Sequence, residues 1–135
     1  MNRIRAVNLV LFCYWVVLFC LTHIPVSLRM ELRINHLDKV FHFAAFAGLA
    51  FLLGWVLSQN RQITFANGIL VFLTASVYAA CDEWTQAFVP GRDPDVWDAA
   101  ADIVGAFAGL LFLVVMFLAM RDSVASSPLA SKNEA

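Results

Sequence analysis

Charged residues are scarce in this sequence of 135 residues: Asp, Glu, Lys and Arg make up 14%, whereas hydrophobic residues make up 61%. Soluble globular domains carry about 25% charged residues, so this composition excludes an ordinary soluble domain and indicates a protein of the lipid bilayer. The formal net charge is −1, and the sequence has no basic tract and no glycine-rich phosphate loop. We therefore exclude nucleic acid as a partner.

Cysteine is also scarce, and the positions of the three cysteines support neither a set of disulfides nor a metal site. Cys13, Cys20 and Cys81 are odd in number, lie within apolar runs and form no Cys-x-x-Cys pair. This pattern excludes a disulfide scaffold and a zinc finger, and we expect all three thiols to be small buried hydrophobic side chains. We assign no metal and no cofactor, while the carboxylates Asp82, Glu83 and Asp98 leave open a divalent cation bound together with a phosphate-bearing substrate.

What the sequence does contain is four long stretches without any charged residue. A charge at the bilayer centre costs roughly 2.5–3.5 kcal/mol and a spanning helix needs roughly 17–25 residues, so each stretch suits a membrane span. Continuous apolar runs of this length favour helices over the shorter alternating strands of a barrel. The four stretches are 6–25, 40–59, 62–81 and 103–120.

The connections between these stretches are short, which requires neighbouring helices to run antiparallel. We therefore predict an all-α fold, an integral membrane four-helix up-down-up-down bundle with both termini on one side. A transmembrane domain is predicted for residues 1–122, and the polar segment 123–135 is predicted to be a disordered cytoplasmic tail. The predicted helices cover about residues 6–25, 40–59, 62–83 and 97–120.

The N-terminal segment has the basic start and the apolar run of a signal peptide, but residues 22–25 offer no small-x-small cleavage site. We expect the segment to be retained as the first helix. Five basic residues fall on the side of the termini and four on the opposite side, and Arg3 and Arg5 directly precede the first span. The positive-inside rule therefore favours cytoplasmic termini.

This topology brings most of the charge to one membrane face. The loop between the first two helices and the loop between the last two emerge together there. With the adjoining helix ends they carry twelve of the nineteen charged residues. These are Arg29, Glu31, Arg33, Asp38, Lys39, Asp82, Glu83, Arg92, Asp93, Asp95, Asp98 and Asp102.

Helical spacing predicts which of these side chains face the same way, because residues three or four positions apart share one face of a helix. Three such stripes occur, one on each of the last three helices, and we expect them to meet at that membrane face. The stripes are Lys39, His42 and Phe46; Tyr78, Asp82 and Gln86, with Glu83 beside them; and Asp95, Asp98, Asp102 and Gly105.

Asp102 is the deepest of these carboxylates. It lies roughly 7 Å along the fourth helix from the interfacial Trp97. A carboxylate at that depth needs a partner or a proton. Lys39 and Arg92 are the cations that the sequence places at the same face, and we expect one of them to pair with Asp102 if it is charged.

Residues 89–92 read as a tight turn at the end of the third helix. Pro90 cannot continue a helix, and Gly91 accepts a positive φ angle. The turn presents Arg92, whose planar guanidinium suits a carboxylate or a phosphate. Arg92 is therefore predicted to be either an internal clamp or a ligand-binding residue.

The polar residues belong to ordered motifs: DKVFHF at 38–43, DEWTQ at 82–86 and FVPGR at 88–92, followed by Asp98 and Gly105. From about residue 38 to residue 109 the sequence resembles the VanZ-like family, whose founding members are linked to glycopeptide (teicoplanin) antibiotic resistance. The resemblance implies a four-helix, multi-pass protein of the bacterial inner membrane with a role in the cell envelope. Asp102 departs from the family pattern, which has asparagine there, and so adds a charge.

The sequence leaves three functions open. The first is a pocket on the extracytoplasmic face that recognises an anionic envelope molecule, such as a lipid-linked sugar or phosphate. The second is a membrane enzyme acting on an envelope precursor, with His42 or Glu83 as the catalytic base. The third is a structural protein whose charged residues only pin the helices. The predicted ligand-binding residues are Lys39, His42, Asp82, Glu83, Gln86, Arg92, Asp98 and Asp102.

The expected partners are the lipid bilayer and a possible second copy of the chain. Gly105 and Gly109 form a GxxxG pair on the fourth helix. Such a pair lets two helices approach closely, either within one bundle or between two copies in a homo-oligomer.

Overall fold

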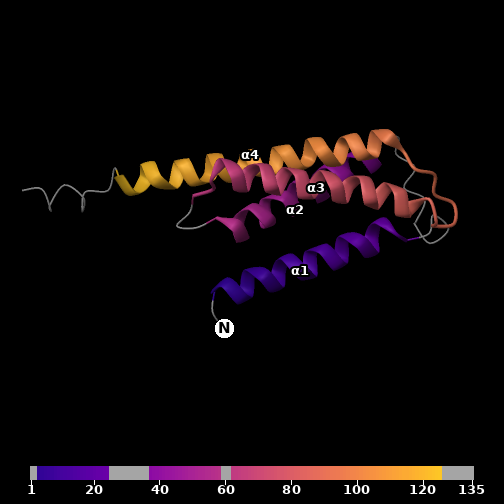
Figure 1. Ribbon diagram of the computed structural model, residues 1–135, viewed down its shortest axis with the longest axis horizontal. Coiled ribbons are helices and arrows are strands. Elements are labelled where there is room, and N and C mark those ends of the chain that lie inside the picture. Colours follow the sequence, from indigo (N-terminus) through magenta and orange to yellow (C-terminus); the bar gives the residue numbers. More distant parts are fainter. Residues whose placement is uncertain (1–2, 25–36, 59–61, 126–135) are drawn as a thin grey trace, which may run out of the picture.

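The computed structural model describes residues 3–24, 37–58 and 62–125, which form four helices (Figure 1). These are α1 (Arg3–Thr22), α2 (Leu37–Leu57), α3 (Phe65–Gln86) and α4 (Val96–Ala125). All four are long and apolar enough to cross a membrane. The described residues form no strand, so the predicted all-α class is confirmed.

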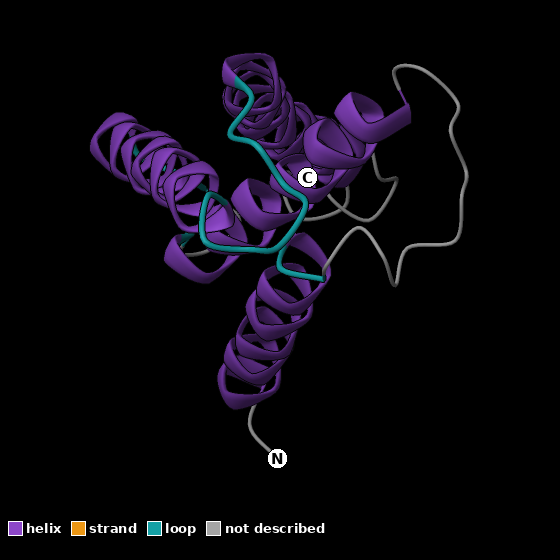
Figure 2. Ribbon diagram, turned by 90° about the vertical axis from the view of Figure 1, so that its right-hand side faces the viewer, coloured by secondary structure: helices purple, strands orange, loops and turns teal. Residues whose placement is uncertain are grey.

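Successive helices run antiparallel (Figure 1). α1 and α3 run one way along the bundle and α2 and α4 run the other way, so the start of α1 and the end of α4 lie at the same end. This is the predicted up-down-up-down arrangement. α1 stands apart from the other three helices toward its N-terminus, as both views show (Figures 1 and 2).

The helix ends differ from the charge-free stretches by a few residues, and α1, α2 and α3 each stop short of a stretch at one end, at Thr22, Leu57 and Phe65 respectively. α2 begins at Leu37, so Asp38 and Lys39 belong to its first turn, and α4 continues to Ala125. Charges at helix ends lie near the lipid headgroups, where they cost little, and an acidic residue in a first turn also complements the helix dipole. Several predictions fall outside the described residues: those for Arg29, Glu31, Arg33, Arg61, Lys132 and the tail from residue 126 onward.

α2 and α4 form the most extensive contact of the bundle, and two glycines permit it. A Cβ atom at Gly105 would clash with the carbonyl oxygen of Phe43, and one at Gly109 would clash with that of Ala47. The glycine pair therefore packs against α2 within the chain, at backbone-to-backbone distance. A role of the same pair in a homo-oligomer stays a prediction.

α1 attaches to the bundle through a small number of contacts. The Tyr14 hydroxyl donates a hydrogen bond of 2.7 Å to the carbonyl oxygen of Ala45 on α2. Leu18 is buried against Phe46 and Leu49 of α2 in a shared apolar cluster. These contacts lie in the middle and at the C-terminal part of α1, which agrees with its separation from the bundle toward the N-terminus (Figure 1).

The outer surface of the bundle is apolar, as a surface that faces lipid must be. Large exposed hydrophobic side chains occur on every helix, for example Phe12, Phe41, Leu73, Val77, Phe107 and Phe112. Cys13, Cys20 and Cys81 are also exposed. The prediction that these thiols are buried is therefore wrong, because in a bilayer an apolar thiol can face hydrocarbon on the outside of the bundle at little cost.

The glycine contact between α2 and α4 can be tested by adding one methyl group. Gly105→Ala is expected to lower the free energy of unfolding by about 1–3 kcal/mol, because the new Cβ forces the two backbones apart. Reversible unfolding in mixed detergent micelles measures the loss.

Gly68→Ala on α3 is the matched control. Its Cβ would lie 3.9 Å from Cδ2 of Leu110, an ordinary contact. Stability should therefore stay unchanged or rise by up to about 1 kcal/mol, since alanine favours helix over glycine. Equal losses in both variants would contradict a close contact at Gly105.

Candidate functional site

Four helix ends meet at the end of the bundle opposite the chain termini: the C-terminal ends of α1 and α3 and the N-terminal ends of α2 and α4 (Figure 1). The polar side chains that interact there form what we call the polar cluster. It consists of Thr22, Lys39, His42, Asp82, Glu83, Gln86, Arg92, Asp95, Asp98 and Asp102. The structure thus brings together all of the sequence-predicted site residues.

Lys39 lies between two carboxylates at the rim of the polar cluster. Its Nζ atom is 2.7 Å from Oδ2 of Asp95 and 2.7 Å from Oδ1 of Asp98. Asp98 is nearly buried, with 8% of its side chain exposed, whereas Lys39 and Asp95 keep 34% and 40%. One of the two ion pairs is therefore open to the surroundings and the other is enclosed.

Asp95 precedes α4 and caps it. Its Oδ1 accepts a hydrogen bond of 2.8 Å from the backbone N–H of Trp97, which is the usual role of an aspartate before the first helical residue. The hydrogen bond from Lys39 holds the pKa of the Asp95 carboxyl below its usual range. Asp95 therefore remains a carboxylate at neutral pH.

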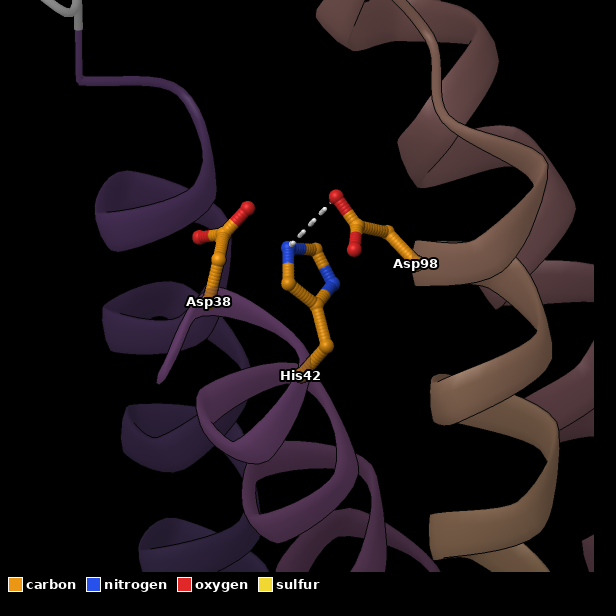
Figure 3. Close-up of side chains that lie close together, drawn as sticks. All are labelled: Asp38, His42 and Asp98. Atoms are coloured by element: carbon orange, nitrogen blue, oxygen red, sulfur yellow. Dashed lines mark ion pairs between the residues drawn. The ribbon is translucent and has the colours of Figure 1, made fainter. Parts of the chain in front are cut away.

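His42 occupies the centre of the polar cluster. Its Nδ1 atom is 3.0 Å from Oδ1 of Asp102 and its Nε2 atom is 3.9 Å from Oδ2 of Asp98, while Asp38 lies on the other side of the ring (Figure 3). Asp102 is completely buried. The hydrogen-bond partner that the structure gives Asp102 is thus His42, not Lys39, which pairs with Asp95 and Asp98 instead.

Glu83 reaches the same centre from α3. Its Oε2 atom accepts a hydrogen bond of 3.0 Å from the backbone N–H of Asp95, which ties α3 to the start of α4. Its Oε1 atom lies 4.0 Å from Nδ1 of His42. Oε1 of Glu83 and Oδ2 of Asp102 are both buried and have no hydrogen-bond partner among the described residues.

Asp82 forms a second part of the polar cluster, on the side of α1. Its Oδ1 accepts a hydrogen bond of 2.9 Å from the Thr22 hydroxyl, and its Oδ2 accepts one of 2.6 Å from the Gln86 amide. His23 joins this part, with Nε2 3.0 Å from Oγ1 of Thr85. Sequence reasoning missed Thr22 as a site residue, because a single threonine at the end of an apolar stretch carries no motif.

Arg92 also reaches α1. The predicted turn is present, with a positive φ of 81° at Gly91 and a hydrogen bond of 3.1 Å from the Arg92 backbone N–H to the Val89 carbonyl. The guanidinium Nη1 donates to the backbone carbonyl oxygen of Thr22. A cation beside the last carbonyl groups of α1 complements the negative end of that helix.

Exposed aromatic side chains lie at the same end of the bundle as the polar cluster. Trp84, Phe88 and Trp97 are all largely exposed, and they lie near the end of α3 and the start of α4. Tryptophan is enriched where a membrane meets water, because its ring is apolar and its N–H is polar. The rings therefore mark this end of the bundle as the headgroup level of the membrane.

Two groups of side chains have the composition and spacing to hold a metal ion. The first is Asp38, His42 and Asp98, in which Asp38 is exposed, and the second is His42, Glu83 and Asp102, in which every member is buried. In each group the candidate ligand atoms lie within 4.8 Å of one another. His42 belongs to both groups, so a single ion would use one or the other.

The fold and the site together define a four-helix membrane protein with a partly buried polar cluster at one end. Residues 1–118 match the VanZ/LLP1 family, and the chain belongs to that family. The predicted VanZ-like resemblance is therefore confirmed over nearly the whole chain. Comparison with curated proteins and with solved structures found no match.

The pairing of His42 with Asp102 can be tested by removing one partner and then both. His42→Leu should lower the free energy of unfolding by about 3–5 kcal/mol, because it leaves a buried carboxylate without that partner. The double variant His42→Leu with Asp102→Leu should recover most of this loss. The measurement is reversible unfolding of the purified variants in mixed micelles.

Asp102→Asn serves as the conservative control, since its amide keeps the shape and can still bond His42. Its loss should stay below about 1.5 kcal/mol, the value of an ordinary hydrogen bond. If the double variant lost the sum of the two single losses, His42 and Asp102 would not be energetically coupled.

Proposed function

We propose that this protein binds, at the polar end of its bundle, the anionic headgroup of a lipid-linked cell-envelope molecule, namely a phosphate or sugar phosphate carried on a lipid. The observation that carries this proposal is the position of Lys39, between the exposed Asp95 and the enclosed Asp98. A phosphate that replaces Asp95 on Lys39 keeps the amine paired throughout the exchange.

The energies of the two ion pairs favour such an exchange. A pair as exposed as Lys39 with Asp95 contributes only about 0–1 kcal/mol, because water solvates both groups in its absence. The pair with Asp98 is enclosed, and breaking it would leave a buried charge behind. Lys39 is therefore anchored by Asp98 and can change partner on the side of Asp95.

The surroundings suit a sugar phosphate on a lipid. The exposed rings of Trp84 and Trp97 lie at headgroup level, so a phosphate there can keep its lipid chain in the bilayer. Carboxylates accept hydrogen bonds from sugar hydroxyls, and Asp95, once displaced from Lys39, is free to do so. Arg92 adds a second cation at this end of the bundle, beside the end of α1, which Asp82 also holds through Thr22.

The proposal is tested with a polyprenyl phosphate and the matching polyprenyl alcohol, which lacks the phosphate. Native mass spectrometry and thermal stabilisation in detergent should detect the phosphate and not the alcohol. Lys39→Met should weaken binding by roughly 10- to 100-fold, the value of a charged hydrogen bond. Asp95→Asn should tighten binding by up to about fivefold, because it frees Lys39 and preserves the cap of α4.

Arg121→Met is the matched control, because it removes one cation at the opposite end of the bundle, on α4. It should leave binding unchanged. If Lys39→Met and Arg121→Met bind the phosphate equally well, the proposal is wrong. An unchanged cell-envelope phenotype in the double variant Lys39→Met with Asp98→Leu would show that these two residues only pin the helices.

Catalysis on such a molecule is the second candidate function. A specific observation favours it: His42 is oriented by Asp102 at 3.0 Å, which is the arrangement of a general base and the group that positions it. Glu83 is the other candidate base. The same incubations with polyprenyl phosphate separate the two functions, because an enzyme would release a product that mass spectrometry detects and a binding protein would return the lipid unchanged.

We also propose the orientation in the bacterial inner membrane, with the chain termini in the cytoplasm and the polar cluster on the extracytoplasmic side. Arg5 near the start of α1 and Arg121 near the end of α4 lie at one end of the bundle, where basic residues favour the cytoplasm. At the other end Lys39 and Arg92 are engaged in the polar cluster and therefore report less about orientation.

Labelling of single cysteines tests this orientation. In a chain with Cys13, Cys20 and Cys81 replaced by alanine, Asp93→Cys should react with a membrane-impermeant maleimide on intact spheroplasts. Asp122→Cys should react only after permeabilisation. The reverse pattern would place the polar cluster in the cytoplasm.

A further inference from the structure

The centre of the polar cluster contains two carboxylate oxygens that no neighbour satisfies. Oε1 of Glu83 and Oδ2 of Asp102 have no hydrogen-bond partner among the described residues, and they belong to side chains that are 9% and 0% exposed. A buried carboxylate oxygen without a partner carries a large desolvation cost. Such atoms therefore indicate a ligand of positive charge or a donor at this point.

The same two side chains converge on His42. Its Nδ1 atom lies 3.0 Å from Oδ1 of Asp102 and 4.0 Å from Oε1 of Glu83. Atoms that bind one divalent ion at about 2.0–2.2 Å are separated from one another by roughly 3–3.5 Å. The pair of His42 and Asp102 already has this spacing, and Oε1 of Glu83, at 4.0 Å, reaches it with respect to His42 after a shift of less than about 1 Å.

The surroundings of the His42 ring also suit a metal ligand, because a carboxylate lies near each of its two nitrogens. A histidine that binds a metal through one nitrogen directs its other ring N–H at a carboxylate or carbonyl group, which fixes the ring and its tautomer. Here Nε2 faces Oδ2 of Asp98 at 3.9 Å (Figure 3), and Asp98 is itself held by Lys39 at 2.7 Å. Nδ1 is therefore the nitrogen that faces Glu83 and Asp102.

We infer that His42, Glu83 and Asp102 form a binding site for a divalent transition-metal ion, of the class of Zn²⁺ or Mn²⁺. One imidazole nitrogen and two carboxylates suit these ions, and both carboxylates would be satisfied by the same positive charge. Three protein ligands leave at least one coordination position open. That position could accept a phosphate oxygen, and this last step alone rests on the proposed function.

The test uses purified full-length protein without a histidine tag, stripped with a chelator and then titrated with Zn²⁺ or Mn²⁺ alone. Isothermal titration calorimetry and elemental analysis after desalting should give one ion per chain, and the ion should raise the melting temperature. Co²⁺ should give the visible absorption of a site with nitrogen and oxygen ligands. Glu83→Gln and Asp102→Asn, which keep side-chain shape, should each weaken binding at least tenfold.

Two further variants test whether the metal ion binds at this site rather than to acidic residues in general. Asp82→Asn removes a buried carboxylate that is bonded to Thr22 and Gln86, outside the group around His42, and should leave metal affinity unchanged. Asp98→Asn should weaken binding roughly 10- to 100-fold, because it removes the carboxylate to which Nε2–H of His42 would donate once Nδ1 binds the ion.

No saturable binding by the wild-type protein, or equal affinity of the wild type, Glu83→Gln and Asp102→Asn, would overturn the inference. The metal titration and the polyprenyl phosphate experiment can fail independently of each other. Protein that binds polyprenyl phosphate but no metal would refute the metal site only. Protein that binds metal but no polyprenyl phosphate would refute the proposed function only.

Discussion

The constraint on which this structure depends is the cost of burying carboxylates in a bundle that is otherwise surrounded by apolar material. Asp82, Glu83, Asp98 and Asp102 are all buried. Lipid is as apolar as a leucine side chain, so the apolar surfaces of the helices gain little by meeting one another in a membrane. Polar groups, in contrast, must find partners. Hydrogen bonds between side chains of different helices therefore fix how one helix is placed against the next. Lys39 and His42 connect α2 to α4, and Thr22 connects α1 to α3.

The close packing of α2 on α4 and the geometry of the polar cluster are one continuous feature. Asp98, Asp102, Gly105 and Gly109 follow one another on a single face of α4. Gly105 meets the carbonyl oxygen of Phe43, the residue directly after His42. A larger residue at position 105 would move that part of α2 outward, and the hydrogen bond between His42 and Asp102 would lengthen with it. The two glycines therefore set the distance between α2 and α4, and this distance allows His42 to form its hydrogen bond with Asp102.

Much of this arrangement could be predicted from spacing alone. The charge-free stretches predicted four antiparallel helices, and the three- and four-residue spacing predicted which side chains share a face. The start of α2 was predicted three residues late, because Asp38 and Lys39 are charged although a first helical turn tolerates them, and the start of α3 was predicted three residues early. The pairings could not be predicted, since helical spacing defines a face but not the rotation of one helix relative to another. We therefore predicted Lys39 or Arg92 as the partner of Asp102, whereas the structure pairs Asp102 with His42. The contribution of α1 was also missed, because Thr22 gives no signal in an apolar sequence.

The two parts of the polar cluster differ in how completely their buried oxygens are hydrogen-bonded. A network that only joined helices would be expected to close, with every buried oxygen bonded inside the protein. The part around Asp82 does close, because both of its carboxylate oxygens accept hydrogen bonds from Thr22 and Gln86. The part around His42 does not, since Glu83 and Asp102 each keep one buried oxygen without a partner among the described residues. The two parts are adjacent on α3, and the metal ion that we propose would satisfy the open oxygens of Glu83 and Asp102 in the part around His42.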